Sequence, residues 1–356
     1  MSRRSDKSKS PDAPSVSAKD AAEIIRGHVR RTYGPRVLGP PAGTVSGLRL
    51  DFNEKLFKRN YHEPVLMGTM AGTGAKATMA QAADYRGLGQ DVVAMAVNDL
   101  VAQGAEPLFV QHYLAGALVE SREIVDVIAG LADGCEQAGC ALLGGESGHR
   151  HRADHPSGTF DLVASAVGVC ELSRAVDGSR AEAGDVLLGL AGAGIHAAAF
   201  EAAIRIVRAA ELSIVHPFAE LKAPDTLARV LLTPTHNHGS AIVSVLRKYK
   251  VKQVITGMVS VAAGGLSGSL LRLLGSSLNA QIDATRWEPP PIFHFLQARG
   301  GLGDVEMFET FNMGIGYVVS VKPHFAEAVT RQLKRKGEMV RVIGELANGA
   351  GQVMMR

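Results

Sequence analysis

The sequence predicts an α+β fold made of two units, each built around a mixed sheet. Length is the first observation, because 356 residues exceed what a single ordinary core organises, and two domains are therefore expected. Composition is the second, since 46% of the residues are hydrophobic and can fill two cores. The order of segments is the third: helical and strand-like stretches alternate along the chain, and no short repeat is visible.

The N-terminal end is predicted to be a disordered tail, residues 1–17. It is basic and rich in Ser and Pro, a composition typical of a solvated segment rather than a binding arm. It has no apolar run of the kind that a secretory signal requires. A first helix is expected over residues 18–31, and Pro35, Pro40 and Pro41 then indicate a loop.

The first unit is predicted to comprise residues 18–170. After the first helix, segments with the apolar period of a strand alternate with segments that have the period of a helix. Strands are predicted at residues 45–52, 65–69, 108–114, 141–143 and 162–169. Helices are predicted near residues 90–103 and from residue 121, where apolar side chains recur at helical spacing up to a Gly139 stop.

The second unit, residues 171–356, follows the same alternation. Strands are predicted at residues 185–190, 251–261, 317–321 and 340–344. Helices are predicted at residues 197–210, 225–232, 240–248, 266–274 and 324–336.

Charge and cysteine usage exclude several classes of protein. The net charge is only +3 with both signs interspersed, which argues against a nucleic-acid-binding protein. The longest uncharged run, residues 186–200, is too short to span a bilayer, so no membrane association is expected. The three cysteines, Cys135, Cys140 and Cys170, show no metal-binding spacing and are typical of reduced thiols in a cytoplasmic protein.

One polar pair, Asn98-Asp99, interrupts an apolar segment at residues 92–109. An unpaired buried carboxylate is costly, so Asp99 is expected to have a cation, a metal ion or a tight set of hydrogen bonds as its partner. The alternative is that Asp99 caps or braces a neighbouring loop.

Five motifs connect the chain to a known family. They read NDLVAQGAEPLF at 98–109, CALLGGES at 140–147, FDLVASAVG at 160–168, LLTPT at 231–235 and ETFNMGIG at 309–316. In this order and spacing they resemble the aminoimidazole ribonucleotide (AIR) synthase family, from about residue 17 onward. The resemblance implies an N-terminal mixed-sheet domain, which binds ATP and dimerises through its strands, and a C-terminal α/β sandwich domain. It also implies a cytoplasmic, homodimeric ligase of purine biosynthesis that acts on a small-molecule ribonucleotide with ATP and Mg²⁺.

The resemblance also assigns site residues. His196 and Asp99 fall on catalytic positions. Nucleotide-binding positions correspond to Lys76, Gly72, Gly74, Asn98, Gly144, Gly145 and Asn312. Metal positions correspond to Asp99, Glu146 and Asp161. The residue types suit the chemistry, because carboxylates bind Mg²⁺, glycines let backbone N–H groups approach phosphates, and a lysine supplies a point charge.

Several family motifs are altered in this chain. The nucleotide loop Asp-Gly-Val-Gly-Thr-Lys is here AGTGAK at 71–76, and the Arg that follows Leu-x-Pro-Thr is His236. Each lost charge-assisted contact to phosphate would cost about 1.5–3 kcal/mol. We therefore expect a cyclo-ligase that converts formylglycinamidine ribonucleotide to AIR with impaired or altered activity. The alternative is a non-catalytic paralogue that acts as a binding or assembly protein.

Histidines stand where the family has none: His112, His149, His151, His155, His236 and His238. If the family fold holds, several line one cleft beside His196. Such a set can bind a transition metal ion or, when protonated, an anion. The third interpretation is that they are solvated residues in a disused cleft, and the sequence leaves all three open.

Overall fold

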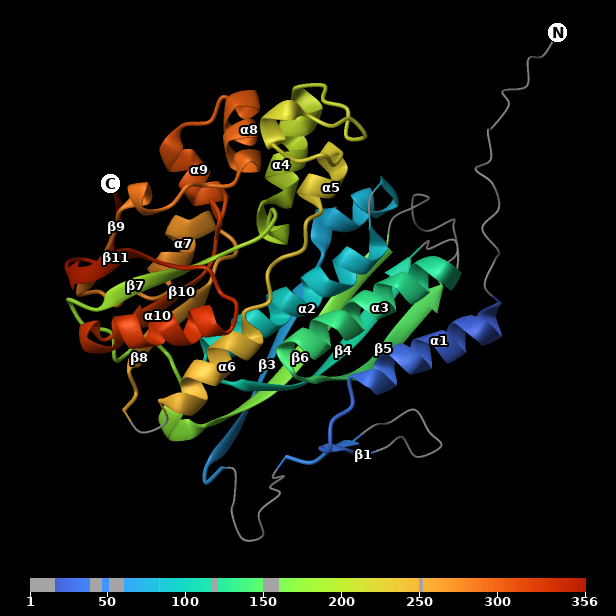
Figure 1. The fold of residues 1–356 in the computed structure, drawn as a ribbon, viewed down its shortest axis with the longest axis horizontal. Helices are drawn as coiled ribbons and strands as arrows, with labels where there is room; N and C mark the ends of the chain where they lie inside the picture. Colours follow the sequence, from blue (N-terminus) through green and yellow to red (C-terminus); the bar gives the residue numbers. More distant parts are fainter. Residues whose placement is uncertain are drawn as a thin grey trace.

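A computed structural model describes residues 17–38, 47–50, 61–82, 84–116, 121–149, 160–249 and 252–356. Within these residues a four-stranded sheet lies in the first half of the chain, a six-stranded sheet in the second, and a two-stranded ribbon beside the first (Figure 1). Each of the two larger sheets contains parallel and antiparallel pairs. The predicted α+β fold with mixed sheets is confirmed. The predicted disordered tail lies outside the described residues, apart from Ser17.

The first sheet has the order β3-β6-β4-β5. Its strands are β3 (Pro64–Gly72), β4 (Glu106–Gly116), β5 (Ala141–His149) and β6 (Phe160–Glu171). The helices of this half are α1 (Ala18–Arg31), α2 (Tyr85–Ala102) and α3 (Ser121–Ala138), with the 3₁₀ helix η1 (Gly74–Ala82) after β3, and the ribbon is β1 (Val37–Leu38) with β2 (Gly47–Leu48). Figure 1 shows α2 and α3 side by side on one face of the sheet, with α1 next to α3.

The two faces of this sheet differ in exposure, because side chains alternate along each strand. Even-numbered residues of β6 from Phe160 to Ala166 are buried towards α2, whereas Asp161 is exposed on the other, outer face. Leu66, Met70 and Tyr113 are 60%, 70% and 42% exposed. The outer face is therefore unusually apolar for a surface in contact with water.

The second sheet has the order β12-β9-β11-β7-β10-β8. Its strands are β7 (Val186–Ala191), β8 (Ile255–Ser260), β9 (Leu278–Ile282), β10 (Ile315–Val321), β11 (Val340–Asn348) and β12 (Val353–Met355). The helices of this half are α4 (Ala197–Ala209), α5 (Leu227–Leu231), α6 (Gly239–Lys248), α7 (Gly265–Leu271), α8 (Pro291–Gly300), α9 (Asp304–Thr310) and α10 (Ala326–Arg335).

Helix α2 occupies the middle of the molecule. It packs on α3 so closely that a Cβ atom added to Gly130 would lie 1.9 Å from the carbonyl oxygen of Arg86. On its other side it contacts η1, β8 and α6, and α6 and β8 belong to the second half. One hydrophobic cluster consequently extends from Ala77 to Val340 through both halves, and a smaller cluster fills the second half alone.

The structure differs from the sequence-based expectations at several elements. Of the predicted strand at residues 45–52, only Gly47–Leu48 forms among the described residues, and β8 begins at Ile255 rather than at residue 251. The strand predicted at 141–143 continues through the Gly-Gly-Glu sequence as β5. Elements β9, β12, α8 and α9 were not predicted. Helix α8 begins at Pro291, because proline suits the first turn of a helix, where its missing N–H is not needed.

Candidate functional site

The structure separates the expected site residues into two groups. One group lies at one end of the four-stranded sheet and comprises Gly72, Gly74, Gly144, Gly145, Glu146 and Asp161. The other lies on or against α2, where the two halves of the chain meet, and comprises Lys76, Asn98, Asp99 and His196. Asn312 lies in the second half, where its Nδ2 is 3.5 Å from the carbonyl oxygen of Gly194.

Strand register brings the first group onto the outer face of the sheet. Gly72 pairs with Val163, Val163 with Tyr113, and Tyr113 with Glu146, so these residues form one row across four strands. Asp161 lies two residues further along β6 on the same face. Both carboxylates are exposed, and neither has an ion-pair partner among the described residues. Two unneutralised carboxylates near a run of glycines suit an Mg²⁺–phosphate ligand.

The glycine pair of β5 lies against one of the unexpected histidines. Gly144 has a φ of +122°, and a Cβ atom on Gly145 would lie 2.4 Å from Nδ1 of His112. Burial lowers the pKa of His112 to about 4, although a hydrogen bond with the backbone of Gly144 opposes this shift. His112 is therefore neutral near pH 7, and its ring lies directly against Gly145.

Lys76 points into the core of the described structure. Its side chain is fully buried, and its Nζ lies 2.9 Å from Oδ1 of Asp91 on α2. The same carboxylate oxygen accepts a 2.7 Å hydrogen bond from the backbone N–H of Thr235. The ammonium group neutralises a buried carboxylate, which differs from the phosphate contact that the resemblance implies.

Asn98 and Asp99 point to different partners in the second half of the chain. Asn98 donates to the carbonyl oxygen of His236 and accepts from the backbone N–H of His238, at 2.8 and 2.9 Å. Asn98 therefore braces the loop that precedes α6, a role that the sequence left open for Asp99.

Asp99 lines a cavity of about 280 Å³ together with Ser260, Arg272 and Asp177. Burial raises the pKa of Asp99, while a hydrogen bond with Ser260 and the positive charge of Arg272 oppose the rise. Ser260 and Arg272 are thus the two groups that favour the ionised form of Asp99 against its burial. Because Glu146 lies on the opposite face of the sheet from α2, the expected metal site of Asp99, Glu146 and Asp161 is not assembled within one chain.

His196 and Asn312 carry buried polar atoms that have no partner among the described residues. His196 occupies the N-cap position of α4, and its Nδ1 lies 2.7 Å from the carbonyl oxygen of Val261. A carbonyl oxygen only accepts hydrogen bonds, so Nδ1 carries the proton and Nε2 presents a buried lone pair. Burial lowers the pKa of His196 to about 4, which keeps the ring neutral. Oδ1 of Asn312 is also buried without a partner.

The unexpected histidines that the structure describes fall into two separate groups. His112 lies within the first half of the chain, whereas His236 and His238 lie together on the loop that precedes α6. The side chain of His149, and all of His151 and His155, lie outside the described residues. The structure adds Glu338, whose carboxylate reaches both His236 and His238. No local sequence signal identifies Glu338, because about 100 residues separate it from the histidines.

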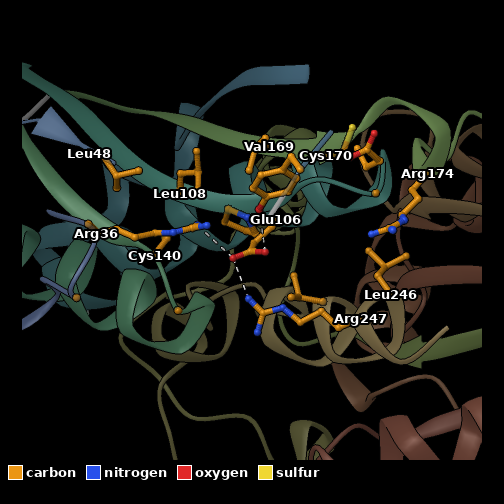
Figure 2. Close-up of a pocket in the computed structure, with 18 of the residues that line it drawn as sticks. Arg36, Leu48, Glu106, Leu108, Cys140, Val169, Cys170, Arg174, Leu246 and Arg247 are labelled. Carbon is orange, nitrogen blue, oxygen red and sulfur yellow. Dashed lines mark hydrogen bonds and ion pairs between the residues drawn. The ribbon is translucent and has the colours of Figure 1, made fainter. Parts of the chain in front are cut away.

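A larger cavity, of about 690 Å³, opens near the beginning of β4 (Figure 2). Glu106 binds Arg36 at 3.4 Å, Arg247 at 2.8 Å and the hydroxyl group of Tyr61 at 3.2 Å. These contacts join the N-terminal segment, the first sheet and α6. The cavity lies about 30 Å along β4 from the level of Asp161, at a strand rise of about 3.3 Å per residue. None of the expected site residues lines it.

None of the described helices is long and apolar enough to cross a lipid bilayer. All three cysteines are buried and unpaired.

Sequence comparisons match both halves of the chain to family models. Residues 61–170 match "AIR synthase related protein, N-terminal domain", and residues 182–355 match "AIR synthase related protein, C-terminal domain". Phosphoribosylformylglycinamidine cyclo-ligase of Bacillus cereus (strain B4264) is 38% identical over 334 residues, which cover 93% of each chain. The enzyme of the same name from Geobacillus kaustophilus (strain HTA426) is 38% identical over 333 residues, which cover 93% of this chain and 92% of the relative.

Two solved structures with the same fold are more distant in sequence. Thiamine-monophosphate kinase from Stenotrophomonas maltophilia K279a superposes with a TM-score of 0.67 at 18% identity, covering 95% of this chain and 96% of that one. Hydrogenase maturation protein HypE in complex with ATP gives a TM-score of 0.64 at 17% identity, covering 96% and 92%. At this identity the likeness shows the fold alone.

Proposed function

This chain belongs to the AIR synthase-related protein family, and we propose that it is an ATP-dependent cyclo-ligase that makes aminoimidazole ribonucleotide from formylglycinamidine ribonucleotide. The observation that carries the proposal is the 38% identity to named cyclo-ligases over 93% of the chain. The thiamine-monophosphate kinase structure, which shares the fold, is 18% identical. In the proposed reaction ATP activates the formyl amide oxygen, the amidine nitrogen closes the ring, and phosphate leaves.

We assign the nucleotide and its Mg²⁺ ion to the outer face of the first sheet. Glu146 and Asp161 supply exposed carboxylates there, and Gly72 and Gly144 leave the backbone accessible. Mg²⁺ commonly takes one or two protein carboxylates and completes its shell with phosphate oxygens and water. Bound there, the ion would neutralise the phosphates and favour departure of phosphate. We assign Asp99 and His196 to binding of the ribonucleotide substrate. Both residues lie where the two halves of the chain meet.

The same face is our proposed homodimer interface. Exposed Leu66, Met70 and Tyr113 lie on it, and a second copy of the face would cover them. Pairing would also enclose Glu146 and Asp161 of each chain. The variant Met70→Lys is expected to shift the protein to monomers in sedimentation velocity, whereas Met339→Lys, at a position that is 73% exposed outside this sheet, is not. A wild-type protein that sediments as a monomer at micromolar concentration would contradict this interface.

We further propose that phosphate binding is weaker than in cyclo-ligases with the full family loop. Lys76 is already neutralised by Asp91, and position 71, where the family has an aspartate, is alanine. Losing two charge-assisted contacts at about 1.5–3 kcal/mol each corresponds to two or more orders of magnitude in affinity.

The test is turnover by the purified full chain with formylglycinamidine ribonucleotide, ATP and Mg²⁺. The ligase proposal expects equal amounts of ADP and aminoimidazole product, and an ATP KM in the high-micromolar range or above. Glu146→Gln is expected to reduce kcat/KM for ATP at least about tenfold. Glu345→Gln, an exposed strand carboxylate in the second sheet, serves as the matched control and should leave kcat/KM unchanged. No product at saturating substrate overturns the proposal.

A second candidate function is a non-catalytic paralogue that binds or assembles with other molecules. The observation that favours it is the full burial of the Lys76 ammonium group, which removes a phosphate contact without unfolding the loop. Growth of an AIR synthase-deficient strain without purines, supported by this gene, would exclude that role. For both candidates we propose a cytoplasmic location, which the three unpaired cysteines support.

A further inference from the structure

Two imidazoles and one carboxylate converge where the loop before α6 meets the turn after α10. Oε2 of Glu338 lies 2.9 Å from Nδ1 of His238 and 3.4 Å from Nε2 of His236. The three donor atoms all lie within 4.8 Å of one another. The side chains of His238 and Glu338 are 1% and 4% exposed, whereas that of His236 is 46% exposed.

The backbone on both sides of this cluster is fixed. Asn98 holds the carbonyl group of His236 and the N–H group of His238, so one asparagine orients the whole His-x-His segment. On the other side, Gly337 adopts a φ of +91° after α10, and the N–H of Glu338 bonds to the carbonyl oxygen of Leu333. The three side chains are therefore positioned by elements that do not depend on a ligand.

The spacing of the donors suits a small tetrahedral cation. With metal–nitrogen bonds of about 2.0–2.1 Å, two ligands of a tetrahedral zinc ion lie about 3.3–3.4 Å apart. The separations of 2.9 and 3.4 Å from the carboxylate oxygen are close to this value. Two histidines and one glutamate leave a fourth position, and the exposed side of His236 opens that position to water. Imidazole nitrogen favours zinc and similar transition metals over Mg²⁺.

We propose that His236, His238 and Glu338 form a binding site for one divalent transition metal ion of the zinc class. The site is separate from the proposed nucleotide face, because Glu146 and Asp161 lie on the side of the first sheet away from α2. The site includes position 236, where the family has an arginine and this chain has a histidine. A bound metal ion would therefore restore a positive charge at this position. The ion would link the loop that carries His236 and His238 to the turn after α10, which carries Glu338.

Binding exchanges one set of contacts for another. In the metal-free protein His238 donates its Nδ1 proton to Glu338. In the metal complex Nδ1 would bind the ion through its lone pair, and the ring would carry its single proton on Nε2 instead. The burial of His238 and Glu338 makes the exchange favourable, since a positive ion offsets a buried carboxylate more fully than one neutral imidazole does.

The test is direct titration of chelator-treated full-length protein with Zn²⁺ by calorimetry, repeated with Co²⁺ and its visible absorption. The proposal expects one ion per chain and a higher thermal midpoint with Zn²⁺ than with Mg²⁺. His236→Asn, at an exposed position, and Glu338→Gln are each expected to weaken Zn²⁺ binding at least about tenfold.

The matched control is His294→Asn. His294 and Glu288 form an exposed pair at 3.2 Å, which resembles the His236–Glu338 contact but lacks a second histidine. The control should bind Zn²⁺ as the wild type does. Failure of the wild type to bind Zn²⁺ overturns the proposal, as does unchanged affinity in both His236→Asn and Glu338→Gln. If Glu338→Gln does not fold, as judged by circular dichroism, His236→Asn alone decides the outcome. None of these results depends on ligase activity.

Discussion

The Asn98 amide spans the His-x-His loop: its Oδ1 accepts a 2.9 Å hydrogen bond from the backbone N–H of His238, and its Nδ2 donates to the carbonyl oxygen of His236. Asn98 is 1% exposed, so this is a buried contact between the two halves of the chain. The two residues of the Asn98-Asp99 pair therefore have different roles. The Asn98 amide holds the loop, and the Asp99 carboxylate faces a cavity.

Replacing Asn98 by Leu is expected to destabilise the protein, because it leaves a buried donor and a buried acceptor unpaired. The cost is about 1–3 kcal/mol for each group. Urea denaturation measures it as a lower midpoint. Asn279→Leu is the control, since Asn279 also accepts hydrogen bonds from two backbone N–H groups, those of residues 350 and 352, but at the exposed C-terminal end. Equal losses in the two variants would show that the loop contact has no special importance.

The Lys76–Asp91 pair gives a second prediction. Lys76→Met leaves the Asp91 carboxylate buried without its cation, and we expect a loss of about 3–5 kcal/mol. The double variant Lys76→Met/Asp91→Leu removes both charges and should recover much of that loss, although the N–H of Thr235 then lacks its acceptor. Equilibrium unfolding of the four members of this cycle measures the coupling. No recovery in the double variant would argue that Lys76 acts elsewhere, as in a phosphate contact.

Replacing Asp99, unlike replacing Lys76, is not expected to destabilise the protein. Burial raises its pKa, so the ionised carboxylate costs stability at neutral pH, and Asp99→Asn should leave the melting temperature unchanged or higher. Ligase turnover should fall at least about tenfold if Asp99 meets the substrate. Asp177→Asn tests the same cavity with a carboxylate already held by Ser179, and should retain most turnover. A less stable Asp99→Asn protein with full turnover would contradict the assignment.

His112 gives a prediction about pH. Its pKa is about 4 in the folded protein and about 6.5 when unfolded, so the unfolded state binds more protons below pH 6.5. Stability should therefore decrease as the pH falls from about 6.5 to about 4, by about 2–3 kcal/mol from this group alone. His112→Gln should remove this contribution to the dependence of stability on pH. The contribution of His196, whose pKa is shifted similarly, should remain. Denaturation midpoints measured at half-unit steps of pH test this expectation, and an unchanged slope contradicts it.

The regular elements were predictable where the apolar period is strong. Helix α1 begins and ends at the predicted residues 18 and 31, and α4 ends within one residue of its predicted position. Short or polar elements such as α9 and β12 were missed, because few apolar residues reveal their period.

The separation of the expected site residues could not be predicted from the motifs. It depends on the strand order β3-β6-β4-β5 and on the register that aligns Tyr113 with Glu146, neither of which follows from local periodicity. The motifs indicate which residues matter but not the direction of their side chains. Lys76 occupies its family position and still points into the core, and Glu338 joins the two histidines only through tertiary packing.

The continuous core through α2 has a consequence for how the molecule comes apart. Neither half can lose its structure without exposing apolar side chains of the other, since Ala77 and Val340 belong to one cluster. We therefore expect the two halves, which separate family models match, to unfold in one cooperative transition. A cut near residue 175 would yield two fragments that aggregate alone and regain structure only when mixed.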